Sequence, residues 1–169
     1  MKKPKFVTGE EAAAMIKDDS TIATIGMTLV SASETILKAI EKRFLETGSP
    51  NHLTLVHSCG QSDRDRGIQH FSHEEMLYRI IGGHWGLQPR MMKLISENKI
   101  LAYCIPQGQF AQLYRSMAGG EPGKITKVGL GTFIDPRIDG GKMNAITKDA
   151  PDIVDVVTID GEEYMRYKP

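Results

Sequence analysis

Short apolar runs that stop at a glycine, or at a turn containing one, constrain the fold more than any other feature of this sequence. Three such runs occupy residues 21–25, 53–56 and 100–105. Runs of four to six apolar residues bounded by turn residues are typical of buried strands. Because segments with helical spacing lie between them, the sequence predicts an α/β protein with an open, mostly parallel sheet covered by helices on both faces.

The helices are predicted from apolar periodicity and from signals at their ends. Thr8 and Glu11 have the spacing of a capping box, which predicts a first helix at about residues 8–17. A second helix is expected between the serines at 31–33, which we interpret as capping residues, and Gly48. Further helices are predicted at residues 76–81, from Pro89 to about residue 98, and at 109–118.

The carboxy-terminal part of the chain has β signals. Residues 125–130 are expected to form a fourth strand or an extended segment. Residues 153–159 and 164–167 flank an Asp160-Gly161 turn, and that pattern predicts a β-hairpin.

Composition limits the class of protein and its partners. With 169 residues, 40% of them hydrophobic, the chain is expected to form a single domain over residues 1–169 with one core. Its 21 basic residues equal its 21 acidic residues, which argues against nucleic acid and membrane surfaces as partners. Two cysteines without CxxC spacing, and no apolar stretch of about 18 residues, predict a soluble, cytoplasmic protein with reduced thiols.

Familiar ligand motifs are incomplete. Gly129-Leu130-Gly131 lacks the third glycine of a dinucleotide fingerprint, and there is no Walker A sequence. The histidines and cysteines at 57, 59, 70 and 73 lack the further ligands that a zinc site needs, so no metal is expected. His84 is interpreted as a loop residue that hydrogen-bonds backbone.

The ends of the predicted strands are the expected site. In parallel sheets, ligands bind beyond the carboxyl ends of the strands. Gly26, Cys59-Gly60 and the segment Pro106-Gln107-Gly108 all follow predicted strands. We therefore expect these three breaks to converge on one crevice.

Residues 103–144 resemble the family I CoA-transferases. The likeness is carried by P-Q-G followed by a helix, by K-V-G-L-G-T-F-I-D-P-R at 127–137 and by G-G-K-M-N at 140–144. It extends back through I-G-G-H-W-G-L-Q-P-R at 81–90, D-R-D-R-G at 63–67 and E-K-R-F-L-E-T-G at 41–48. Nearly the whole chain is similar to the amino-terminal, alpha-like half of the acetate, propionate and acetoacetate CoA-transferases, whose two halves are fused in one chain.

The resemblance implies a reaction and the partners it needs. In that family a glutamate carboxylate attacks an acyl-CoA, and CoA then passes through a glutamyl-CoA thioester to another acid. The resemblance implies acyl-CoA and short-chain carboxylates as substrates, and coenzyme A as substrate with no other cofactor. A homo-oligomer is expected, because the apolar face that should meet the second half would be uncovered in this chain. The glutamate belongs to the second half, in a motif like S-E-N-G, so a second half or subunit is an implied partner. Ser96-Glu97-Asn98-Lys99 is a poor substitute, because it ends a predicted helix in the wrong half.

The same resemblance assigns residues to the site. Gln107 corresponds to the glutamine near the catalytic carboxylate, where an amide can orient it, and Gly26, Pro106 and Gly108 are expected to contact substrate. The first glycine loop departs from the family's G-G-F…G-x-P pattern, since only Gly26 is retained. The alternative is a non-catalytic domain of the same fold that senses a sugar phosphate or acyl-CoA, or that serves in assembly.

Overall fold

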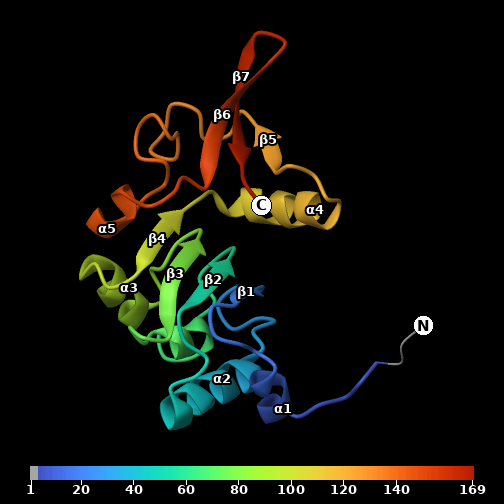
Figure 1. The fold of residues 1–169 in the computed structure, drawn as a ribbon, viewed down its shortest axis with the longest axis vertical. Coiled ribbons are helices and arrows are strands. Elements are labelled where there is room, and N and C mark those ends of the chain that lie inside the picture. Colours follow the sequence, from blue (N-terminus) through green and yellow to red (C-terminus); the bar gives the residue numbers. More distant parts are fainter. Residues whose placement is uncertain (1–3) are drawn as a thin grey trace.

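A four-stranded parallel sheet forms the centre of the molecule (Figure 1). The computed structural model describes residues 4–169. The strands are β1 (Thr21–Thr24), β2 (Leu53–His57), β3 (Leu77–Gly82) and β4 (Leu101–Cys104), in the sheet order β1-β2-β3-β4. Every neighbouring pair is parallel. The predicted α/β class and parallel sheet are confirmed.

Most helices pack on one face of this sheet, which we call the first face. They are α1 (Gly9–Ala14), α2 (Glu34–Thr47), the 3-10 helix η1 (Gly67–Phe71) and α3 (Pro89–Ser96). Side chains that alternate along the strands meet the helices in one buried cluster, which includes Leu53, Leu55, Ile80 and Ala102 from the sheet and Leu37, Ile40, Met91 and Ile95 from the helices. Alternation places the residues between them on the opposite, second face.

The helix predicted at residues 76–81 is wrong, because this segment is strand β3 between β2 and β4. Met76, Leu77, Ile80 and Ile81 have helical spacing, but short apolar runs fit either period. The side chains of Leu77 and Ile80 are 1% and 0% exposed, so their burial between two strands decides the outcome.

The ends of the first two helices differ in how they are capped. Thr8 and Glu11 form the predicted capping box of α1. Gly48 ends α2 with a φ of 73°, the left-handed conformation that glycine adopts without strain. Ser33 is the N-cap residue of α2, but its side chain makes no capping hydrogen bond, and that part of the prediction is wrong.

A second layer follows β4. It contains α4 (Gln107–Ala118), β5 (Lys124–Thr126), the short helix α5 (Ala145–Lys148), and the hairpin β6 (Val154–Ile159) and β7 (Glu162–Tyr167). The hairpin prediction is confirmed, and β5 pairs with β7 to give an antiparallel sheet ordered β5-β7-β6. Of the segment predicted to be extended at 125–130, only Ile125 and Thr126 belong to β5, and the rest forms a bend and a turn. A second buried cluster joins α4 to this sheet through Ile105, Phe110, Leu113, Ile134, Val154, Met165 and Tyr167.

The glycine-rich segment between β5 and α5 is tied to both sheets. The Arg137 side chain hydrogen-bonds Asp135, whose side chain is 1% exposed, and Glu163 of β7. The backbone N–H of Cys104 donates to the Gly141 carbonyl at 2.7 Å, which pairs this segment with the outer edge of β4. One edge of the parallel sheet is therefore covered, whereas β1 lies at the opposite edge with strand β2 as its one partner among the described strands.

Candidate active site

The loops at the carboxyl ends of the four parallel strands contact one another in sheet order. The Cys59 thiol donates to the Gly26 carbonyl at 3.0 Å, and the Gly60 carbonyl accepts from the Thr28 N–H at 3.0 Å. The Gly60 N–H in turn donates to Nε2 of His84 at 3.2 Å. This links the loops after β1, β2 and β3, as expected for strand breaks at one edge of a sheet.

Gln107 is the first residue of α4 and is exposed at this edge. Its neighbour is the loop after β3, because a Cβ placed on Gly83 would lie 3.4 Å from Cβ of Gln107 and 2.4 Å from the Ser58 carbonyl oxygen. The Ile105 N–H donates to the Gly82 carbonyl at 3.1 Å. Gln107 is therefore held on a support made of two close-packed loops.

The other residues predicted for the site lie along the same edge. Pro106 and Gly108 flank Gln107, and Gly108 is exposed with open space around its Cα. Gly26 lies in the loop after β1, separated from Gln107 by the loops after β2 and β3. Gly26 has a φ of 144°, and a Cβ there would lie 2.8 Å from the Val30 carbonyl oxygen. The structure thus groups three predicted residues at one point and places Gly26 further along the row.

Several buried polar side chains beneath these loops were not predicted from the sequence. His57, Trp85 and Gln88 are 0%, 4% and 0% exposed. Burial of His57 lowers its pKa to about 4, against a smaller opposing effect of the hydrogen bond to the Cys59 carbonyl. The only sequence signals for this cluster were the glycines around His84 and the position of His57 at the end of a predicted strand.

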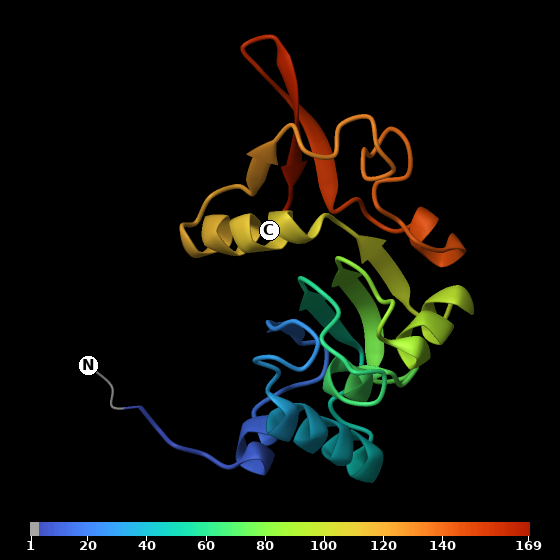
Figure 2. The same ribbon diagram turned by 180° about the vertical axis from the view of Figure 1, so that it is seen from behind.

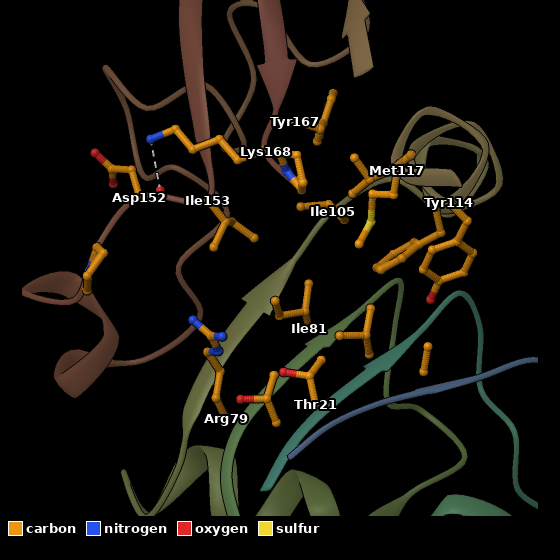
Figure 3. A pocket seen from close by; sticks show the side chains of 17 residues that line it. Thr21, Arg79, Ile81, Ile105, Tyr114, Met117, Asp152, Ile153, Tyr167 and Lys168 are labelled. Atoms are coloured by element: carbon orange, nitrogen blue, oxygen red, sulfur yellow. Dashed lines mark hydrogen bonds between the residues drawn. The ribbon is translucent and has the colours of Figure 1, made fainter. Parts of the chain in front are cut away.

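A cavity of about 520 Å³ lies between the second face of the parallel sheet and the second layer (Figure 3). Its floor includes Thr21, Arg79 and Ile81, and Tyr114 and Met117 of α4 line one side. Most of the walls are apolar. The Arg79 Nε and the Tyr114 hydroxyl are buried polar atoms without a hydrogen-bond partner in residues 4–169, and burial raises the pKa of Tyr114.

The view from behind shows α4 lying across the carboxyl edge of the sheet (Figure 2). Gln107 is at the first turn of this helix, while Phe110, Leu113 and Tyr114 face the cavity from the same helix. One helix therefore borders both the row of strand-end loops and the cavity.

Glu97 lies away from this edge. It follows α3 and precedes β4, which places it at the amino ends of the strands, and its side chain is 48% exposed beside Lys93. The structure separates it from Gln107 by the length of β4. Glu97 therefore does not replace the glutamate of the resembled family.

Three other properties concern the described part of the chain. Residues 4–169 contain no group of three or more His, Cys, Asp or Glu side chains arranged to hold a metal ion. None of their helices has both the length and the apolar character needed to cross a membrane. Cys59 and Cys104 are free thiols.

Solved structures share this architecture. An acyl-CoA transferase of Escherichia coli O157:H7, YdiF, in a thioester complex with CoA, superposes with a TM-score of 0.89 at 36% identity, covering 96% of this chain and 32% of that one. Glutaconate CoA-transferase from Acidaminococcus fermentans is similar in fold, with a TM-score of 0.68 at 14% identity over 96% of this chain and 52% of that one.

The curated relatives that are similar in sequence are also CoA-transferases. Caffeate CoA-transferase of Acetobacterium woodii is 41% identical over 97% of this chain and 31% of its own length. The alpha subunit of acetate CoA-transferase from Escherichia coli K12 is 23% identical over 99% of this chain and 66% of its own length. The chain thus spans about a third of the caffeate enzyme. Because residues 6–169 match the coenzyme A transferase family, this chain belongs to that family.

Proposed function

We propose that this chain forms the amino-terminal, alpha-like part of an acyl-CoA:carboxylate CoA-transferase that moves CoA between short-chain acids. The observation that carries the proposal is the position of Gln107, exposed at the start of α4 in the row of strand-end loops. Family membership and the similarity to an acyl-CoA transferase structure support it. Coenzyme A takes part as a substrate, and no other cofactor is proposed.

The proposed chemistry preserves the thioester through two exchanges. A glutamate carboxylate, supplied by protein outside this chain, attacks the acyl-CoA carbonyl, and the CoA thiolate leaves to give an acyl-glutamyl anhydride. The thiolate then attacks the glutamyl carbonyl, which forms glutamyl-CoA and releases the first acid as its carboxylate. A second carboxylate accepts the CoA by the reverse of these steps, and the glutamate is regenerated.

The contribution of this chain is to orient and stabilise. The Gln107 amide N–H donates to the glutamate carboxylate or to the oxyanion formed from it, and the support from Gly83 fixes the start of the side chain. Pro106 and Gly108 border the substrate beside it, and Gly26 borders it at the far loop. No proton transfer within this chain is needed for the exchange.

Exposed apolar surface supports a further protein segment as partner. Ile25, Met27 and Val30, in the loop after β1, are 72%, 62% and 67% exposed. They follow β1, which lies at the uncovered edge of the parallel sheet. Several exposed apolar side chains in one short loop are typical of an interaction site, so a second half, a second subunit or another copy of the chain would cover them.

The test is reconstitution. The isolated chain should not exchange CoA between acetyl-CoA and propionate, and addition of a carboxy-terminal CoA-transferase segment carrying the glutamate should restore the exchange. In the restored enzyme, Gln107→Ala should lower kcat by about 10- to 1,000-fold, as loss of one positioned donor does. Gln112→Ala, an exposed glutamine of the same helix, is the matched control and should leave kcat unchanged.

Turnover by the isolated chain would contradict the need for a partner, and equal rates for the two variants would remove Gln107 from the site. One alternative follows from the cavity, which the chain forms by itself. A ligand-sensing or assembly domain would bind CoA or a sugar phosphate as an isolated chain and would remain inactive after addition of the second segment. Calorimetric titration of the isolated chain distinguishes the two functions.

A further inference from the structure

Buried polar groups without partners cluster beneath the loop that supports Gln107. In residues 4–169, His57 Nε2, Trp85 Nε1 and both amide atoms of Gln88 have no hydrogen-bond partner. All three side chains are at most 4% exposed. Buried polar atoms are paired in nearly all native structures, so a group of unpaired ones requires an explanation.

The hydrogen bond of the other His57 nitrogen fixes its tautomer. Nδ1 lies 2.9 Å from the Cys59 carbonyl oxygen, which can only accept, so Nδ1 carries the proton. Nε2 is therefore an acceptor. The indole Nε1 of Trp85 is only a donor, which makes the two unpaired nitrogens chemically complementary.

Gly82 brings these two nitrogens to one place. A Cβ on Gly82 would lie 2.4 Å from Nε2 of His57 and 3.0 Å from Nε1 of Trp85. The two rings are arranged edge to face, with centroids 6.3 Å apart. Both nitrogens thus lie beside the position that a Cβ of Gly82 would occupy, where a short shift or one ordered water joins them.

A second contact of the same kind lies beside the first. A Cβ on Gly60 would lie 3.2 Å from Nε2 of His84 and 3.1 Å from Nε2 of Gln88. His84, Trp85 and Gln88 all belong to the loop between β3 and α3, and His57 and Gly60 belong to the end of β2 and the loop after it. Side chains of the β3–α3 loop therefore pack against the backbone of the loop after β2 at Gly60.

We propose that His57 is a positioning residue of the candidate active site: its neutral Nε2 accepts from Trp85, directly or through one water, and so fixes the β3–α3 loop beneath Gln107. The loop transmits this position through Gly82, whose carbonyl accepts from the Ile105 N–H, and through Gly83, which lies against Gln107. The role in catalysis rests on the proposed CoA transfer, whereas the pairing of His57 with Trp85 does not.

The first test uses the isolated chain and needs no activity. Nitrogen NMR at pH 7 should show the His57 proton on Nδ1, and finding it on Nε2 would overturn the proposal. Trp85 is the only tryptophan, so the fluorescence reports on the surroundings of this one indole. The fluorescence should change near pH 4 as His57 is protonated. The titratable side chains near His57 are His84, in the facing loop, and Cys59, in the loop that follows His57.

Two variants distinguish protonation of His57 from other effects of acid on the fluorescence. His57→Asn keeps a donor for the Cys59 carbonyl but removes Nε2, and it should lose the fluorescence transition while far-UV circular dichroism stays unchanged at pH 7. His52→Gln, an exposed histidine at the other end of β2, should retain the transition. A transition that persists in His57→Asn, or that is absent from the wild type, would contradict the pairing.

The second test concerns positioning in the reconstituted enzyme. His57→Asn should lower kcat by about 10- to 100-fold, because displacement of the support by about 1 Å costs about that much, with the KM for acyl-CoA unchanged. Gly82→Ala places a methyl group against both rings and should lower kcat in the same way. Gly86→Ala is the control: its new Cβ would have its nearest neighbour at 3.9 Å, so kcat should be unchanged. Unchanged kcat in both His57→Asn and Gly82→Ala would overturn the positioning role. A wild-type mixture without transfer would instead refute the proposed function and leave the spectroscopic result standing.

Discussion

The two faces of the parallel sheet differ although they are built from alternating residues of the same strands. On the first face, Leu53, Leu55 and Ile80 are all 0% exposed beneath the helices. On the second face, Thr21 and Ala23 are exposed, and Arg79 and Ile81 border the cavity. The first face is packed by this chain alone, and the second is covered only where α4 and the hairpin reach it.

This difference shows how structural and interaction roles are divided within one sheet. Leu, Ile and Ala side chains fill the first face, which is what close packing by amphipathic helices requires. Thr, Arg and partly buried apolar side chains occupy the second face, as expected of surface that meets another segment or a ligand. Four predictions test this contrast, from the largest effect to the smallest.

Truncation of adjacent residues in β2 compares the faces directly. Leu55→Ala should lower the free energy of unfolding by about 2–5 kcal/mol, because it leaves a cavity in a close-packed cluster. Val56→Ala, on the second face and half-buried, should lower it by about 1 kcal/mol, since less buried surface is lost. Urea unfolding measures both, and equal losses would show that the two faces are equally packed.

Acid should weaken the first face through carboxylates that bind buried imidazoles. Both ring nitrogens of His70 lie close to carboxylate oxygens, Glu34 at 2.8 Å and Glu41 at 2.5 Å, and His73 bonds Glu41 at 2.8 Å. Burial alone would raise the pKa of Glu41, but the hydrogen bonds from His73 and His70 outweigh it and hold the pKa below its ordinary value of 4.5. The contact between α2 and η1 therefore depends on ionised carboxylates.

The direction of the pH effect on stability follows from the linkage between protonation and folding. A carboxyl group whose pKa is lower in the folded state contributes stability above its unfolded pKa, here 4.5, and loses it as the pH falls through the lowered value. Glu41→Gln should therefore reduce the free energy of unfolding at pH 7 and flatten its decline below pH 4.5. Glu46→Gln, on an exposed turn of the same helix, is the control. An identical decline in Glu41→Gln would exclude this cluster as its source.

Charge on the exposed apolar loop should change association more than stability. Met27→Lys and Val30→Lys should reduce self-association of the isolated chain, because they place charge on surface that is 62% and 67% exposed. Unfolding midpoints should stay nearly unchanged. Sedimentation velocity over a range of concentrations measures the effect, and a wild-type chain that is monomeric at every concentration would contradict it.

The smallest effect is expected at Gly108, in the first turn of α4. In Gly108→Ala the new Cβ has no neighbouring atom within 4 Å. The substitution should therefore raise the free energy of unfolding by about 0.4–1 kcal/mol, through higher helix propensity and lower entropy of the unfolded chain. Thermal unfolding measures this gain. If Gly108 also borders substrate, the KM in the reconstituted enzyme should rise while stability increases, and an unchanged KM would remove Gly108 from the site.

The sequence predicted features that depend on local chemistry. The capping box at Thr8, the turn at Asp160-Gly161 and the strands β1, β2 and β4 were recognisable because neighbouring residues determine them. The strand β3 was not, since Met76, Leu77 and Ile80 fit two periods and only burial between β2 and β4 distinguishes them. Local patterns cannot show which strands will lie on either side of a segment.

The candidate site was predictable only in part for the same reason. Pro106-Gln107-Gly108 could be found because a strand end, a turn and a resemblance coincide there. The pairing of His57 with Trp85 could not be predicted, because it joins residues of two separate loops. It also depends on Gly82, where any side chain would collide with both rings. The cavity likewise combines one face of three strands with α4 and the final hairpin, which are distant in the sequence.

Strand order in the parallel sheet coincides with order along the chain, and this has a consequence for synthesis. As the chain leaves the ribosome, β2 can add to β1, β3 to β2 and β4 to β3, each on a neighbour already made. The antiparallel sheet cannot grow in this way, because β5 pairs with β7, whose residues emerge about 40 positions later. During that interval α4 and the second face lack the cover that the hairpin provides, so this part of the nascent chain stays open to chaperones until β7 has been made.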